Sequence, residues 1–293
     1  MAVKRVDHVV VAVPSVEEAA EAYERLGLRL SPLARHRGLG TENRAMFVHA
    51  ADGEFYVELL GIHDRAAALG SSRGMLYLEA IERGGGLARL MLGVEGLGTV
   101  VAKLAAAGHG GGVEAIYRER GDKLAEVAAL EGLPGLGINA GLIEYAETQA
   151  ERVSRHEEAG LFAHGFPLKR LDHLAAIAPD LEGATRAWTD GLGIAVHGEV
   201  AGRGMVIRQM KVGDAIVELL GPESPESPIA SRPPGLASMC AWEVEDLDAA
   251  VALARERWFS PSEPVVGVLP GTRVATIPAA ELAGLGMQLL EYV

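Results

Sequence analysis

Two histidines and four glutamates recur at corresponding places in the two halves of the chain, and side chains of these types bind metal ions. Residues 4–13 read Lys-Arg-Val-Asp-His-Val-Val-Val-Ala-Val, and residues 169–178 read Lys-Arg-Leu-Asp-His-Leu-Ala-Ala-Ile-Ala. Each half later contains Val-Glu-Leu-Leu-Gly and closes on Glu-Tyr. One imidazole and two carboxylates favour Mn, Fe, Ni, Zn or Mg. The candidate metal ligands are His8, Glu58, Glu144, His173, Glu218 and Glu291.

The two halves are expected to fold alike, because the residues around these side chains repeat one pattern of elements. Val6–Val13 is a short β-branched run typical of a buried strand. Ser15 and Glu18 then form a capping box for a helix, which Gly27 is placed to end. The second half repeats this order, with Asp180 as the N-cap and one residue inserted at the turn after the helix. Three strand candidates follow each helix, which gives a βαβββ unit.

Each half then contains a second unit of the same kind, so the sequence predicts four βαβββ units and an α+β fold. We expect module 1 at residues 1–147, a linker at 148–167 and module 2 at 168–293. Two segments break the symmetry. Residues 75–83 are an additional helical stretch in the first half, and residues 222–228 are a polar, proline-rich loop in the second.

Composition excludes several classes of protein. The 293 residues carry 27 basic and 40 acidic side chains, a formal charge of −13, which opposes binding to nucleic acids or anionic membranes. It leaves room for a local arginine pocket that binds a small anion. The single cysteine excludes an intramolecular disulfide and a cysteine-based zinc site. Without an apolar run of about 20 residues or a signal-peptide pattern, the chain is expected in the cytoplasm.

The repeated blocks resemble the vicinal oxygen chelate superfamily, which includes glyoxalase I, methylmalonyl-CoA epimerase, extradiol dioxygenases, and fosfomycin and bleomycin resistance proteins. The resemblance lies in Asp-His at the first strand, Glu in the fourth and Glu-Tyr at the last. Residues 36–43, 56–60 and 86–89 are similar to its glyoxalase-like branch. The resemblance covers almost the whole chain except the linker. It implies that each module is a curved mixed sheet, a partly open barrel or bowl, with its helices outside.

The resemblance also implies where the metal ligands lie. Each histidine would project into its bowl from the first strand, and the two glutamates from the fourth and eighth strands. The fifth strand usually supplies a histidine in catalytic members, but this chain has Arg89 and Met239 there. Arginine stays protonated, and methionine is a soft ligand better suited to copper. Arg89 could instead pair with Glu58 across the bowl.

Three functions agree with these observations. The first is a metal-dependent glyoxalase-like lyase or isomerase that acts on a small substrate with vicinal oxygens through an enediolate, with Glu144 or Glu291 as general base. The second is an Fe(II) extradiol dioxygenase, whose facial triad would need a second histidine. The third is a non-catalytic protein that sequesters a small molecule without metal.

Other side chains are candidates for contact with the small-molecule substrate. Arg44 and Arg208 lie in predicted strands and could hold a carboxylate bidentately, although a surface salt bridge is the better explanation of either residue alone. The candidate substrate-binding residues are Arg44, Tyr56, Arg89, Arg208 and Met239. Two modules in one chain can supply the pairing that single modules obtain by dimerising, so both a monomer and a homodimer are compatible with the sequence.

Overall fold

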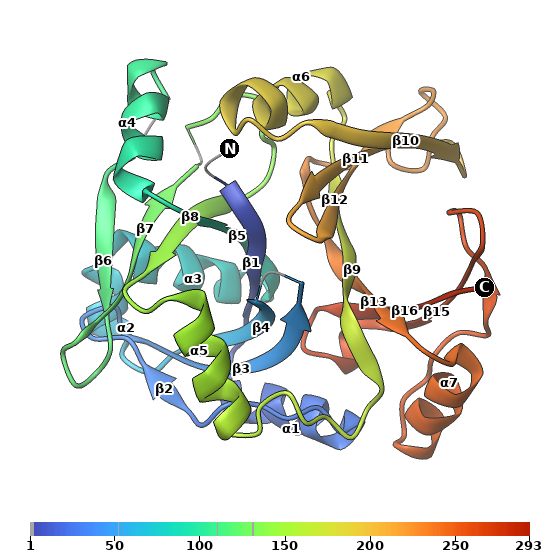
Figure 1. The fold of residues 1–293 in the computed structure, drawn as a ribbon, viewed down its shortest axis with the longest axis horizontal. Coiled ribbons are helices and arrows are strands. Elements are labelled where there is room, and N and C mark those ends of the chain that lie inside the picture. Colours follow the sequence, from blue (N-terminus) through green and yellow to red (C-terminus); the bar gives the residue numbers. More distant parts are fainter. Residues whose placement is uncertain (1–2, 52, 110, 131) are drawn as a thin grey trace.

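Two mixed eight-stranded sheets form the molecule (Figure 1). The computed structural model describes residues 3–51, 53–109, 111–130 and 132–293. The first sheet comprises β1 (Val3–Ala12), β2 (Ala34–Arg35), β3 (Thr41–Ala50), β4 (Gly53–Ile62), β5 (Gly86–Val94), β6 (Val113–Tyr117), β7 (Lys123–Ala129) and β8 (Ala140–Tyr145). The second comprises β9 (Leu168–Ile177), β10 (Val196–Gly202), β11 (Met205–Val212), β12 (Ala215–Pro222), β13 (Gly235–Val244), β14 (Val265–Val266), β15 (Thr272–Ile277) and β16 (Gly286–Tyr292).

The two sheets have the same topology. Their strand orders are β2-β3-β4-β1-β5-β8-β7-β6 and β10-β11-β12-β9-β13-β16-β15-β14. In each, the first strand runs parallel to the fourth and antiparallel to the fifth, so the two βαβββ units of a module join at its centre. This topology confirms the predicted α+β fold of four units in two modules.

The repeated helices pack on the outer faces of the sheets, and Figure 1 shows them at the periphery. They are α1 (Val16–Leu26), α4 (Leu97–Ala106), α6 (Leu181–Arg186) and α7 (Leu247–Glu256). The predicted capping residues of α1 are present: Ser15 Oγ accepts a hydrogen bond from the Glu18 N–H at 3.2 Å, and Gly27 adopts φ +89°. After α6, residues 187–191 form a π-helical turn, which accommodates the residue inserted in the second half.

Module 1 contains two helices that module 2 lacks, α2 (Arg65–Leu69) and α3 (Ser72–Glu82). Tyr77 of α3 is buried among Val10, Leu60 and Met91. Helix α3 therefore lies against the inner face of the first sheet. It is an exception to the predicted placement of the helices outside the sheets. In the segment that connects β8 to β9, helix α5 (Gln149–Glu158) begins with a complete capping box at Thr148 and Glu151.

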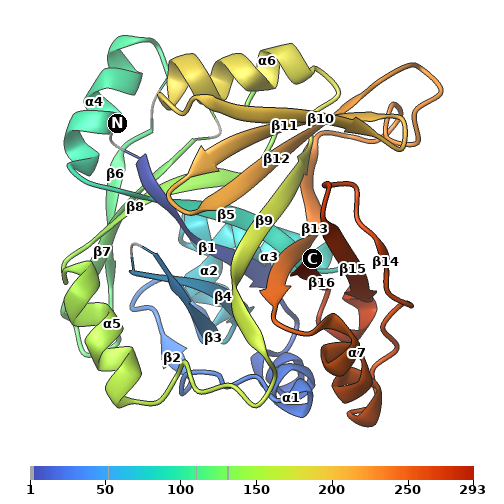
Figure 2. The same cartoon turned by 45° about the vertical axis from the view of Figure 1, so that its right-hand side comes forward.

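One hydrophobic core extends through both modules. Figure 2 shows the two sheets lying against each other. Strand β3 contacts β9, and β5 contacts β13. The rings of Phe55 and Trp242 meet edge to face across the boundary, with centroids 5.7 Å apart. Gly86 and Gly284 touch so closely that a Cβ on Gly284 would lie 2.6 Å from the Gly86 Cα atom. No helix of the described part of the chain is long and apolar enough to cross a membrane.

Candidate functional site

In module 1, His8 and Glu58 face one another on the inner side of the sheet. His8 Nε2 lies 3.7 Å from Glu58 Oε2, and His8 Nδ1 lies 2.8 Å from Asp7 Oδ1. Burial alone would raise the pKa of Asp7, but the hydrogen bond with His8 and the charges of Arg152 and Arg5 hold it well below its usual range. Asp7 is therefore an ionised acceptor, and His8 carries its hydrogen on Nδ1 and directs Nε2 toward Glu58.

Module 2 repeats this geometry. His173 Nδ1 lies 2.7 Å from Asp172 Oδ1, and His173 Nε2 lies 3.8 Å from Glu218 Oε2. Burial lowers the pKa of His173, but the hydrogen bond with Asp172 and the charge of Glu218 outweigh burial, so the pKa is raised overall. The Asp-His pair that recurs in the sequence is thus a recurring hydrogen bond in the structure.

An amide side chain on the neighbouring strand binds each of these glutamates. Asn43 Nδ2 donates to Glu58 Oε1, and Gln209 Nε2 donates to Glu218 Oε1 at 3.1 Å. Sequence reasoning missed both amides. The signal was available in the hairpins β3–β4 and β11–β12, where Gln209 pairs directly with Glu218.

The structure does not bring Glu144 and Glu291 into these groups. The Glu144 carboxylate accepts hydrogen bonds from the N–H groups of Gly96 and Leu97, at 2.7 and 2.9 Å, and so caps the start of α4 on the outer side. Glu291 forms an ion pair with Arg273 at 3.0 Å. In this geometry both carboxylates point away from the bowls, where we expected them as metal ligands and one of them as general base.

The tyrosines that follow these glutamates point inward instead. Tyr145 donates to Asp7 Oδ1 at 2.9 Å, and Tyr292 donates to Asp172 Oδ2 at 2.7 Å. Because side chains alternate along a strand, an inward tyrosine requires the preceding glutamate to face outward. Each tyrosine also stabilises the carboxylate that orients the histidine.

The strand register identifies the residue that does occupy the eighth-strand position in module 1. Glu58 pairs with the residue two positions beyond His8. The same rule applied to β5 and β8 gives Gly141, which pairs with the residue two positions beyond Arg89. Gly141 precedes Glu144 by three residues and supplies no side chain.

Arg89 occupies this part of the module 1 bowl. The residue is 3% exposed, and its Nη2 donates to the Ala140 carbonyl at 3.1 Å. A Cβ on Gly141 would lie 3.0 Å from Arg89 Nη2, so the guanidinium fills the space beside the glycine. The cavity that His8 and Glu58 line, of about 60 Å³, is also lined by Arg73 of α3. A permanent cation at this cavity does not fit a bound metal ion.

Module 2 has a different pair at these positions. Met239 replaces the arginine and is neutral, and Gln288 replaces the glycine, pairing with Ala241 next to His173. His173, Glu218, Met239 and Gln288 line one cavity of about 180 Å³. The described residues contain no cluster of three or more His, Cys, Asp or Glu side chains that could hold a metal ion. Glutamine is not one of these four residue types, but its amide oxygen can also bind a metal ion. Gln288 therefore adds a third potential ligand to His173 and Glu218.

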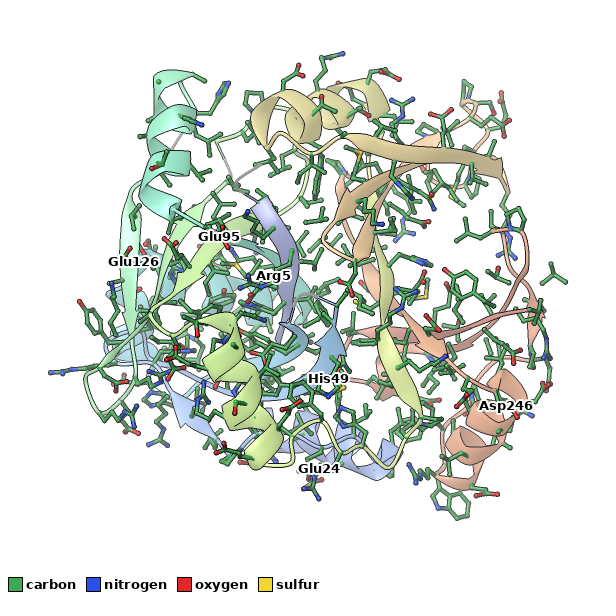
Figure 3. The ribbon with its side chains drawn as sticks, in the orientation of Figure 1. Arg5, Glu24, His49, Glu95, Glu126 and Asp246 are labelled. Atoms are coloured by element: carbon green, nitrogen blue, oxygen red, sulfur yellow. The ribbon has the colours of Figure 1, made fainter. Side chains whose placement is uncertain are left out.

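Among the predicted substrate-binding residues, Tyr56, Arg89 and Met239 face the bowls, whereas Arg44 and Arg208 do not. Tyr56 stacks on the His8 ring, with centroids 4.3 Å apart. Arg44 donates to Glu24 Oε1 at 2.6 Å, on the side of α1 where Figure 3 labels Glu24. Arg208 forms ion pairs with Glu182 at 2.8 Å and Glu199 at 2.7 Å. The two outward arginines are therefore surface salt bridges, the alternative that the sequence left open.

Comparisons with known proteins agree with this architecture. Residues 6–158 match the family described as glyoxalase-like domain, and residues 172–276 match the glyoxalase/bleomycin resistance protein/dioxygenase superfamily. A hypothetical protein from Staphylococcus aureus has a TM-score of 0.66 at 11% identity, covering 98% of both chains. A variant of 4-hydroxymandelate synthase from Streptomyces coelicolor has a TM-score of 0.61 at 14% identity, covering 100% of this chain and 93% of that one.

A shorter match is methylmalonyl-CoA epimerase from Mycobacterium tuberculosis, with 24% identity and a TM-score of 0.40, covering 44% of this chain and 91% of that one. No curated protein matches the chain. Paired βαβββ units in curved sheets, each with His and Glu on the inner face, define a protein of the vicinal oxygen chelate class. The chain belongs to the glyoxalase-like domain family and contains two such modules.

Proposed function

We propose that module 2 binds one divalent metal ion and acts as a lyase or isomerase on a small substrate with vicinal oxygens. The observation that carries this proposal is the convergence of His173, Glu218 and Gln288 on one cavity that contains no buried guanidinium. Module 1 is proposed to bind no metal, because Arg89 and Gly141 occupy the corresponding positions.

The surroundings of the proposed ligands support this role. Asp172 accepts from His173 Nδ1, which leaves Nε2 as the ligand atom, as in carboxylate–histidine–metal arrangements. Gln209 holds one oxygen of Glu218 and so orients the other toward the cavity. A bound ion would polarise the two substrate oxygens and acidify the adjacent C–H group.

The cavity also favours a small substrate and proton transfer. A volume of about 180 Å³ corresponds to roughly six water molecules at about 30 Å³ each. The apolar walls, including Met205, Ile207 and Leu220, exclude water from the reacting atoms. Glu218 is the carboxylate that faces this space, so it is our candidate for the group that accepts the substrate proton. A ring-cleaving dioxygenase is less well supported, because Met239 stands where the second histidine would be needed.

Metal stoichiometry tests the proposal directly. The purified chain is stripped with a chelator, loaded separately with Ni, Zn, Mn, Fe or Mg, desalted and measured by elemental analysis. We expect one ion per chain with at least one of these metals. His173→Ala and Gln288→Leu should lose the ion, whereas His8→Ala, the matched change in module 1, should retain it. Two ions per chain, or none with any metal, would contradict the proposal.

The reaction class is tested by exchange of carbon-bound hydrogen. Small 2-hydroxy and 2-oxo acids are incubated with the metal-loaded protein in D₂O, and deuterium incorporation is measured by NMR. Exchange at the carbon next to the oxygens should depend on the metal and should be lost in Glu218→Gln. Metal binding without exchange of any tested acid would remove the reaction assignment and leave the metal site.

A further inference from the structure

A second and larger hollow lies at the mouth of module 1. This cleft has a volume of about 760 Å³, within the range of about 300–1,000 Å³ typical of small-molecule sites. Three separate segments form its walls: residues 31–36, the turn at 118–120 and helix α5 with the residues that follow it to Leu161. The proposed metal ligands lie in the other module, so the cleft is a separate site.

Aromatic rings form the inner wall of this cleft. Phe47 packs between Tyr56 and His156, with ring centroids 5.0 and 4.1 Å apart. The Tyr56 hydroxyl donates to the Tyr145 hydroxyl at 2.6 Å, and Tyr145 in turn donates to Asp7 Oδ1. Leu124 and further apolar side chains complete the surface. A planar aromatic molecule would find ring faces and edges here to pack against.

The charged groups that line the cleft are mostly cations. Two glutamates, Glu119 and Glu147, face five guanidinium groups across the cleft, in a chain whose formal charge is −13. The five arginines are Arg35, Arg118, Arg120, Arg152 and Arg155. All five arginines also form ion pairs, with Asp7, Glu42, Glu54, Asp122 or Glu147. An anion would therefore bind through the guanidinium donors that these pairs leave over, and not through an excess of positive charge.

Three of these arginines retain hydrogen-bond donors for a ligand. Among the described residues, Arg118, Arg120 and Arg155 share two carboxylates, Asp122 and Glu147. Arg155 also donates to His156 Nε2 at 2.9 Å. A guanidinium has five N–H donors, and a shared carboxylate engages only part of that set. The remaining donors form a fork suited to a carboxylate, sulfonate or phosphate group.

We propose that this cleft binds an aromatic organic anion, with the ring against Phe47 and Tyr56 and the acidic group toward the arginines of the 118–120 turn. The site is independent of the metal proposed for module 2. Helix α5 forms one wall, so a bound ligand would contact the segment that joins the two modules.

Two fluorescent probes that share one aromatic ring system distinguish the contribution of the aromatic wall from that of the arginines. The anionic probe is 8-anilino-1-naphthalenesulfonate, and N-phenyl-1-naphthylamine is the same body without the sulfonate. Both are titrated into the full chain in excess EDTA, so that no metal contributes. We expect one anionic probe per chain, bound about tenfold more tightly than the neutral one, as a net charge-assisted hydrogen bond predicts.

Three variants locate the binding. Arg120→Glu reverses an exposed charge at the cleft and should weaken the anionic probe about tenfold while leaving the neutral probe unchanged. Arg65→Glu is the matched control, since the Arg65 side chain is also well exposed and also has one acidic partner but lies outside the cleft. Ala34→Trp, on the exposed strand β2, should fill the cleft and weaken both probes.

The proposal is overturned if neither probe binds, if both bind equally, if Arg65→Glu acts like Arg120→Glu, or if Ala34→Trp has no effect. Because the titration is done without metal, these outcomes are distinct from a failure of the metal site in module 2.

Discussion

The strands of the two bowls differ at two side chains, and helix α3 adds Arg73 and Tyr77 to the cavity of module 1. Arg89 and Gly141 in module 1 correspond to Met239 and Gln288 in module 2, while the Asp-His-Glu arrangement is common to both. The arginine brings a buried cation, and the glycine leaves room for it. These two exchanges, together with Arg73 of α3, are the reason that we assign metal binding to one module only.

This assignment predicts that the metal site can be transplanted. The variant Arg73→Leu, Arg89→Met, Met91→Ala, Gly141→Gln gives the strands of module 1 the side chains of module 2 and removes the arginine of α3 that lines the cavity. Met91→Ala is included because a Cβ on Gly141 would lie 3.0 Å from the Met91 side chain. We expect the metal content to rise from one ion per chain to two. Elemental analysis decides, and a folded variant that still binds one ion would show that these positions do not control binding.

A different prediction concerns Glu144. Because its carboxylate caps α4, whose N-cap Gly96 has no side chain, Glu144→Ala should destabilise the protein by about 1–2 kcal/mol without changing its metal content. Urea unfolding measures the change. Glu95→Ala, which removes an exposed pair with Lys4, should cost at most about 1 kcal/mol. Equal effects would argue against the capping role.

Strand alternation explains why sequence reasoning misplaced Glu144. Residues 142–145 read Leu-Ile-Glu-Tyr and show no alternation of apolar and polar side chains. The pattern alone therefore does not decide whether Glu144 or Tyr145 points inward. The choice depends on Asp7, which receives the Tyr145 hydrogen bond from 138 residues away. His8 and Glu58 were predictable because adjacent parallel strands place them together.

At the scale of elements, the segment that connects β8 to β9 packs charged side chains against the first sheet. Arg152 of α5 is buried, and its Nη2 atom lies 2.6 Å from Glu54 Oε1. Its Cζ atom lies over the Tyr145 ring, 3.3 Å from the ring centroid. His156 Nδ1 lies 2.7 Å from the same glutamate. The sequence predicted only a linker at residues 148–167, and it could not show that charged side chains of this segment are buried, because their partners lie in β4 and β8.

The end of this segment predicts a pH effect on stability. His164 Nδ1 accepts from the Arg29 N–H at 3.0 Å, and Nε2 donates to the Phe47 carbonyl at 2.7 Å, an arrangement of neutral histidine. Burial outweighs the hydrogen bond to Phe47, and the charges of Arg29 and His49 act in the same direction, so the pKa is lowered from 6.5. Below pH 6.5 the unfolded chain binds a proton that the folded chain resists.

The stability that His164 contributes is therefore present above pH 6.5 and is lost as the pH falls toward the lower folded pKa. We expect the wild type to lose more stability between neutral pH and about pH 5.5 than His164→Gln does. Urea unfolding at both pH values measures the difference. Parallel losses in the two proteins would contradict the prediction.

At the scale of the whole molecule, the two modules share one core. Phe55 and Trp242 meet at the boundary, and one cluster of buried apolar residues includes side chains from both sheets. The duplication of four βαβββ units was predictable from the repeated blocks. The fusion of the cores was not, because the apolar faces of two independent modules would show the same pattern of residues.

The shared core predicts that unfolding is cooperative across the chain. All three tryptophans, at 188, 242 and 258, lie in module 2. Leu142→Ala in module 1 removes a fully buried side chain and should cost about 2–5 kcal/mol. We expect the tryptophan-detected midpoint in urea to fall together with the midpoint measured by circular dichroism. A tryptophan transition that stays in place would show that the modules unfold separately.

The buried guanidinium of Arg89 has a consequence for spectroscopy. Two bowls of one topology sit in one polypeptide at equal concentration, and we assign cation binding to only one of them. Module 1 therefore acts as an internal blank: an NMR shift on metal addition at His173 without a matching shift at His8 separates site occupancy from general effects of ionic strength in a single sample.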